Sequence, residues 1–93
     1  KFPSVTRDIA VVCDATIPVG DLNDCIMAAG GKYLKGCALF DVYQGSHIAE
    51  GKKSVAFSLT MRSDEQTLTD EHAEETIKNV LTALEKEYNA VMR

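Results

Sequence analysis

Three side chains on two neighbouring stretches of the chain could together bind a nucleobase. Asp41 and Tyr43 lie two residues apart, and Ser54 follows in the next apolar stretch. An aromatic ring offers a surface on which an unstacked base can lie, while side chains beside it read the edge of the base. A carboxylate accepts hydrogen bonds from the N1–H and N2–H₂ groups of guanine, whereas it repels a phosphate. Asp41 therefore favours base recognition over backbone binding, although an exposed tyrosine by itself could simply cover sheet surface.

The two stretches that carry these side chains alternate as β-strands do, with successive side chains on opposite faces of a sheet. In the stretch 53–62 the large apolar residues share one face: Val55, Phe57, Leu59 and Met61. The opposite face takes Ser54, Ala56, Ser58, Thr60 and Arg62. In the stretch 37–43, Ala38, Phe40 and Val42 join the apolar face, and Leu39, Asp41 and Tyr43 join the polar one. The pattern predicts an antiparallel sheet with one packed face and one bare, solvated face.

The remaining chain supplies elements that would support this sheet. Residues 4–13 are predicted to form a first strand. Its packed face takes Ile9, Val11 and Cys13, and its open face takes Thr6, Asp8, Ala10 and Val12. Because Val11 and Val12 both suit burial, the reverse assignment of the two faces is an alternative. A helix follows Pro18 and stops at Gly30 and Gly31. Residues 44–52 form a hairpin loop. A second helix begins after a cap at Thr69 and carries an apolar stripe: Ala73, Ile77, Val80, Leu81, Leu84 and Tyr88.

The short tail 89–93 fits a final edge strand, which completes a βαββαβ order. This order predicts an α+β, ferredoxin-like sandwich, in which two helices cover one face of an antiparallel sheet and leave the other face open. The length of 93 residues predicts a single domain, 1–93. Because the chain begins at Lys1 without an initiator methionine, we expect it to be a fragment of a larger chain.

Composition limits the functions that this domain can have. The formal net charge is −4, and it is unevenly distributed along the chain. Residues 64–93 hold three basic and eight acidic side chains, whereas residues 1–63 hold seven basic and six acidic side chains. Nucleic-acid-binding proteins usually carry a basic stripe, so any contact with nucleic acid should be small and local. His47 and His72 have no partner at motif spacing and are expected to be exposed, and the sequence contains no catalytic or metal-binding constellation. No apolar run suits a membrane span, and the three cysteines fit buried thiols in a reducing cytoplasm.

The same residues carry a resemblance to a known family. Four blocks carry it: Phe2 to Ala10, Phe40 to Gly45, Gly51 to Phe57, and Thr67 to Glu71. They resemble the C-terminal ferredoxin-fold anticodon-binding domain of the bacterial phenylalanyl-tRNA synthetase β subunit, and the likeness spans nearly the whole chain. The resemblance implies a tRNA-binding module that recognises the anticodon stem-loop of phenylalanine tRNA. In the family, the first anticodon base, a guanine, lies on the residue corresponding to Tyr43. The residues at Asp41 and Ser54 hydrogen-bond nearby, and Ala10 corresponds to the first-strand residue beneath the base.

The resemblance also implies the setting in which the domain works. The synthetase is a cytoplasmic (αβ)₂ assembly, in which the α subunit carries ATP-dependent aminoacylation with magnesium. This domain would then be non-catalytic, without a cofactor of its own, and its partners would be tRNA, the α subunit and the other β-subunit domains.

Two other functions remain compatible with a βαββαβ order. A regulatory amino-acid-binding domain would use the first strand–helix turn, residues 14–20, which contains one glycine. An acyl-phosphate hydrolase would need an arginine in a glycine-rich anion cradle ahead of the first helix, and the sequence has none there.

Overall fold

The computed structural model describes residues 2–93; Lys1, which the predicted domain 1–93 includes, lies outside the described residues. The elements follow one another as β1 (Val5–Asp14), α1 (Val19–Ala29), a short 3₁₀ turn (Gly31–Tyr33), β2 (Leu34–Tyr43), β3 (Lys52–Met61), α2 (Asp70–Tyr88) and β4 (Val91–Met92). The predicted βαββαβ order is confirmed, and the 3₁₀ turn is an addition that the sequence pattern did not indicate.

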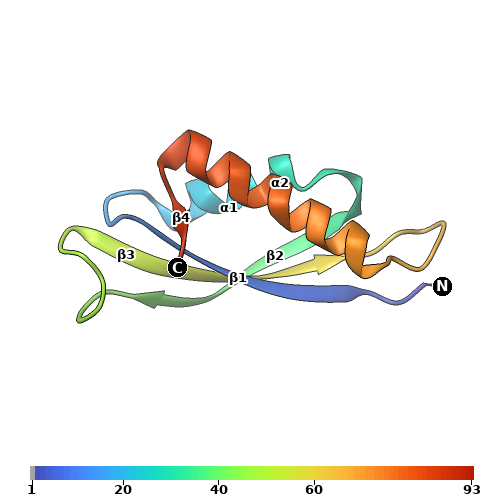
Figure 1. Ribbon diagram of the computed structural model, residues 1–93, viewed down its shortest axis with the longest axis horizontal. Coiled ribbons are helices and arrows are strands. Elements are labelled where there is room, and N and C mark those ends of the chain that lie inside the picture. The colour runs from blue at the N-terminus through green and yellow to red at the C-terminus, as the bar shows by residue number, and fades with distance from the viewer. Residues whose placement is uncertain (1) are drawn as a thin grey trace.

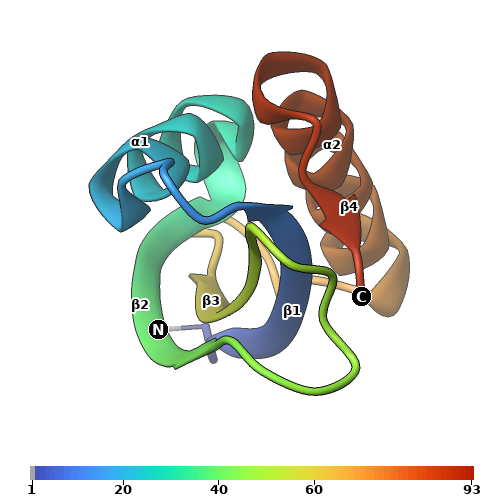
Figure 2. The same ribbon diagram turned by 90° about the vertical axis from the view of Figure 1, so that its left-hand side faces the viewer.

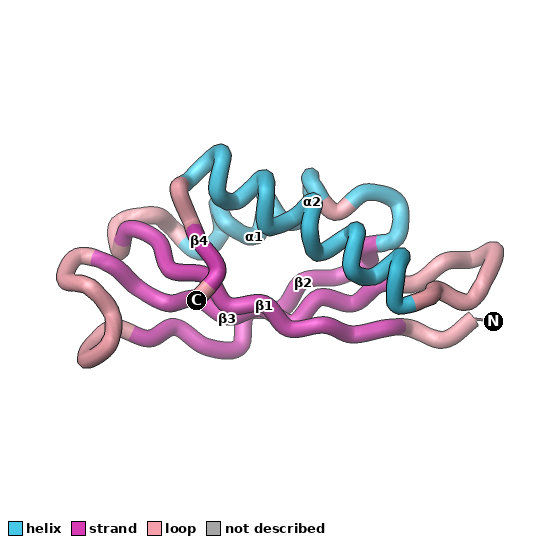
Figure 3. Tube along the Cα trace, in the orientation of Figure 1, coloured by secondary structure: helices cyan, strands magenta, loops and turns pink. Residues whose placement is uncertain are grey.

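The strands form one antiparallel sheet in the order β2-β3-β1-β4. β1 and β3 pair along their full length, from Val5 opposite Met61 to Asp14 opposite Lys52. Both helices lie on the same side of this sheet, as Figures 1 and 2 show from two directions. The loops gather at the two ends of the strands (Figure 3), and the hairpin loop between β2 and β3 lies at the opposite end from the N-terminus. The ferredoxin-like α+β class is therefore confirmed.

The core lies between the sheet and the helices. Its centre is the apolar face of β3, whose large side chains have no exposed surface: Val55, Phe57, Leu59 and Met61. Ile9, Val11 and Cys13 of β1 lie beside them, as the alternation predicted. The helices contribute Leu22, Ile26, Ala73, Val80 and Leu84. Burial of this continuous apolar cluster is the main force that holds the helices on the sheet.

Both ends of α2 are fixed by local hydrogen bonds. The Thr69 hydroxyl accepts a hydrogen bond from the His72 backbone N–H at 3.2 Å, and the Thr69 backbone N–H donates to His72 Nδ1 at 3.2 Å. The predicted cap is confirmed, and His72 is a half-buried part of it rather than an exposed side chain. At the other end Asn89 adopts a left-handed conformation and the Ala90 N–H donates to the Leu84 carbonyl. This turn directs the chain back onto the edge of the sheet as β4.

β2 contains a bulge that the alternation pattern did not reveal. Leu39 pairs with Phe57 and Asp41 pairs with the next residue of β3, Ala56, so Phe40 has no partner of its own. Residues directly opposite one another point to the same face. Leu39 therefore lies on the packed face and Ala38, opposite Ser58, lies on the open face; both predictions were wrong. Phe40, predicted to be in the core, is 58% exposed.

Beyond the bulge, the alternation follows the prediction again. Asp41 and Tyr43 lie on the open face, and Val42, opposite Val55, lies on the packed face. Val42 nevertheless stays exposed, because this half of β2 runs away from both helices (Figures 1 and 2). The bulge thus allows the first half of β2 to contribute to the core while the second half presents its polar residues to the open face.

Candidate nucleic-acid interface

The four residues predicted to bind RNA lie in two adjacent rows across the open face. Asp41, Ala56 and Ala10 are opposite one another in one row, and Tyr43, Ser54 and Val12 are in the next. Rows on one face are separated by about 6.6 Å and neighbouring strands by about 4.8 Å. The sheet therefore brings Ala10, Asp41, Tyr43 and Ser54 together. Ala10 and Ala56 contribute small side chains to the row that carries Asp41.

The hairpin loop holds the Tyr43 ring in place. The phenol hydroxyl donates to the Ser46 carbonyl oxygen at 3.0 Å. Gly45, with φ of +145°, passes so close to the ring that an added Cβ would lie 3.0 Å from the hydroxyl and 3.3 Å from Cζ. The loop therefore needs a glycine at this position. A ring held in this way loses little conformational freedom when a ligand stacks on it.

The open face is less bare than the sequence predicted. The Ser54 residue is only 2% exposed and Ala56 is 8% exposed, although both lie on the side that carries no helix. The cover comes partly from Arg93, whose Nη1 donates to Ser54 Oγ at 3.3 Å. The Arg93 guanidinium carbon also lies 5.7 Å from the centre of the Tyr43 ring, within the range of a cation–π contact.

Arg93 is the site-facing residue that the sequence analysis missed. Its backbone N–H donates to the Ala10 carbonyl at 2.9 Å, which extends the pairing of β4 with β1 by one residue. Val91 and Met92 pair with Val12 and Val11, and Arg93 follows opposite Ala10 on the open face. The only signal in the sequence was the expected edge strand 89–93. A register for that strand beside β1 would have placed its arginine in the same row as Ala10.

The neighbouring lysines at this end of the sheet are engaged elsewhere. Lys52 forms an ion pair with Asp14 at 2.6 Å. Lys53 is buried, and its ammonium group donates to the Ile17 carbonyl on the helix side of the sheet. Of these three cations, Arg93 alone contacts the predicted binding residues. The site thus combines a ring, a carboxylate, a hydroxyl and a guanidinium.

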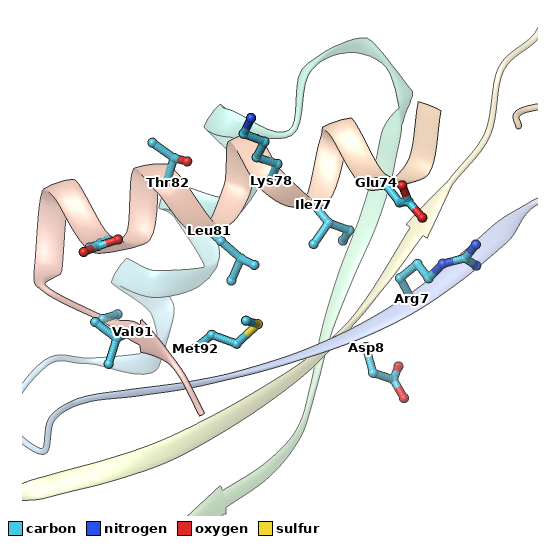
Figure 4. A pocket seen from close by; sticks show the side chains of 11 residues that line it. Arg7, Asp8, Glu74, Ile77, Lys78, Leu81, Thr82, Val91 and Met92 are labelled. Carbon is cyan, nitrogen blue, oxygen red and sulfur yellow. The ribbon is translucent and has the colours of Figure 1, made fainter. Parts of the chain in front are cut away.

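A groove of about 480 Å³ lies on the other side of the sheet, between α2 and the edge formed by β1 and β4. Figure 4 shows Ile77 and Leu81 of α2 facing Met92 of β4 across it, while Asp8 points away. The groove forms because β4 is only two residues long and leaves part of α2 without a strand beneath it. Its walls are largely apolar, and none of the four predicted binding residues lines it.

The cysteines form no disulfide among the described residues. Cys13 is buried, and Cys25 and Cys37 are half-buried against the core. Burial raises the pKa of all three thiols, and that of Cys37 to about 11. The thiols therefore stay protonated and poorly reactive near neutral pH. Neither helix found in residues 2–93 is long and apolar enough to cross a membrane.

The fold and the open face define a ferredoxin-like α+β domain that presents a tyrosine, an aspartate, a serine and an arginine on the sheet surface opposite its helices. The family model of the ferredoxin-fold anticodon binding domain matches residues 1–93, and the chain belongs to this family. This result confirms the resemblance noted in the sequence.

Relatives from several bacteria support the same assignment. The chain is 56% identical, over all of its 93 residues, to the phenylalanine–tRNA ligase β subunits of Bacillus licheniformis and Bacillus subtilis. It is 45% identical over 94 aligned positions to the β subunit of Coxiella burnetii, again covering the whole chain. The chain spans about 12% of the length of each of these relatives.

Proposed function

We propose that this domain binds the anticodon stem-loop of phenylalanine tRNA and that Tyr43 carries the first anticodon base, a guanine. The observation that carries the proposal is the shared face of Tyr43, Asp41 and Ser54 on adjacent strands. Membership in an anticodon-binding family supports RNA as the ligand. It also favours this function over an amino-acid-binding regulatory domain or an acyl-phosphate hydrolase.

Each residue has a distinct role in this proposal. The Tyr43 ring stacks on the base, and its hydrogen bond to Ser46 keeps the ring oriented. The exposed Asp41 carboxylate accepts hydrogen bonds from the N1–H and N2–H₂ groups of guanine, a pair of donors that adenine does not offer. Ser54 supplies a hydroxyl beside the ring, and the small side chain of Ala10 leaves room above the open face of the sheet for the plane of the base.

In the same proposal, the domain is part of a longer β subunit of phenylalanine–tRNA ligase. The α subunit would carry the ATP- and magnesium-dependent aminoacylation, and an (αβ)₂ assembly in the cytoplasm would bring the two functions together. The domain itself would be non-catalytic and would need no cofactor. The similarity to ligase β subunits along the whole chain supports this setting. Phosphate contacts from other domains would compensate for the acidic balance of this one, because such contacts supply most non-specific affinity.

The proposal is tested in the intact ligase by measuring tRNA affinity and the kcat/KM of aminoacylation. Tyr43→Ala should weaken tRNA binding by about 5- to 150-fold, since stacking of one base contributes roughly 1–3 kcal/mol. Asp41→Asn should reduce the preference for guanine over adenine at the first anticodon position, because an amide pairs less well with two donors.

Asp24→Asn is the matched control, because Asp24 is an exposed acid on α1, on the other side of the sheet. It removes the same charge and should change neither affinity nor base preference. Normal tRNA binding and normal base preference in folded Tyr43→Ala and Asp41→Asn enzymes would show that the face is structural only.

A further inference from the structure

The three arginines of the chain differ in whether their guanidinium groups pair with a carboxylate. Arg7 forms an ion pair with Asp70 at 3.1 Å, and Arg62 forms one with Asp64. Within residues 2–93, the structure gives the Arg93 guanidinium no carboxylate at ion-pair distance. Its side-chain contacts are a neutral hydroxyl and an aromatic ring. Arg93 therefore keeps a full positive charge available beside the predicted base-binding surface.

The position of Arg93 conflicts with direct access of a base to Ser54. The guanidinium bonds to Ser54 Oγ and lies over the Tyr43 ring, and Ser54 is almost fully buried. A base edge can reach this hydroxyl only after the guanidinium has moved. The backbone of Arg93 is fixed by its hydrogen bond to Ala10, whereas the side chain is long and exposed. The guanidinium can therefore swing away while the strand stays in place.

We propose that Arg93 covers the site in the free protein and contacts a phosphate next to the stacked base in the complex. This inference rests on the proposed function. A nucleotide that lies on Tyr43 brings its own phosphates to the rim of the site, and a guanidinium forms strong charge-assisted hydrogen bonds with phosphate oxygens. The exchange releases Ser54 Oγ for the base edge at the moment when Arg93 gains an anionic partner. Base and phosphate recognition are thereby coupled.

The test measures binding of the anticodon stem-loop to the intact ligase at several salt concentrations. Arg93→Gln should weaken binding about tenfold at low salt, and the slope of log affinity against log salt should become shallower by about 0.7, the value for one phosphate contact on a single strand. Arg93→Lys keeps the charge and should retain the wild-type slope. Arg62→Gln removes an arginine at the far end of β3 and should leave affinity and slope unchanged.

Two modified RNAs identify the phosphate that Arg93 contacts. Stem-loops with a neutral methylphosphonate at either phosphate flanking the first anticodon nucleotide should abolish the difference between wild type and Arg93→Gln at one of the two positions. The preference for guanine over adenine should persist in Arg93→Gln, because Asp41 is unchanged. An unaltered salt slope, tighter binding, or a loss of affinity that persists with both neutral phosphates would overturn the inference.

Parallel measurement of Tyr43→Ala separates the two proposals. If Tyr43→Ala weakens binding and Arg93→Gln does not, Arg93 is only a cover and anticodon binding stands. If Tyr43→Ala also binds normally, the proposed function itself is wrong.

Discussion

The β2 bulge makes a prediction that separates the structure from a simple alternation of faces. Phe40 and Phe57 both fall on the apolar side in the sequence pattern, and regular alternation would bury both. In the structure Phe57 has no exposed surface, whereas Phe40 is the unpaired bulge residue and is 58% exposed. Replacing each phenylalanine with alanine should therefore give very different losses in the free energy of unfolding.

The magnitudes follow from the buried fraction of each side chain. Truncation of a fully buried phenylalanine costs about 3–5 kcal/mol, because a cavity is left in addition to the lost transfer free energy. Full burial of a phenylalanine side chain contributes about 1.5–3 kcal/mol. Since Phe40 buries somewhat less than half of its surface, Phe40→Ala should cost about 1 kcal/mol. The expected difference between the two variants is thus at least about 2 kcal/mol.

Urea denaturation of the 93-residue chain, followed by circular dichroism, measures both losses. A domain of this size has a total stability of roughly 5–14 kcal/mol, so Phe57→Ala should lower the midpoint strongly and Phe40→Ala only slightly. Equal slopes of unfolding free energy against urea would show that the variants unfold to comparable states. A loss for Phe40→Ala equal to that for Phe57→Ala would show that Phe40 is in the core and that the bulge is absent.

Two further predictions concern the hairpin loop and Cys37. Gly45→Ala places a Cβ 3.0 Å from the Tyr43 hydroxyl at a φ of +145°, so it should displace the ring and weaken tRNA binding by the intact ligase. Gly20→Ala is the control, because no atom lies within 4 Å of its new Cβ, and it should leave tRNA binding unchanged. Equal affinities of the two variants would contradict the role of the loop. Burial raises the pKa of Cys37 from 9.0 to about 11, so the protonated thiol contributes its full stabilisation well below pH 9. At most about 2 kcal/mol of that stability should be lost as the pH rises from 9 to 11. Urea unfolding across this range should show a smaller decline in Cys37→Ala than in the wild type, and identical declines would refute the assignment.

The sequence by itself determined most of the architecture, because local patterns encode it. Strict alternation in β3 separated the core residues from Ser54 and its neighbours, and the apolar stripe of α2 with its Thr69 cap specified a helix that packs on one side. These signals depend on the period of one element, 2 for a strand and 3.6 for a helix. That period also placed Ser54 on the open face, with Asp41 and Tyr43 on either side of Val42, although the same pattern misplaced Ala38 and Phe40.

Only the tertiary structure decided where the alternation breaks and what covers the site. A bulge is a property of a pair of strands: Phe40 becomes the extra residue only because Leu39 and Asp41 pair with consecutive residues of β3. The position of Arg93 likewise depends on β4 pairing with β1, which lies about 80 residues away in the sequence. The period of a single strand contains no information on its register with a distant partner, and that register places a guanidinium over Tyr43 and Ser54.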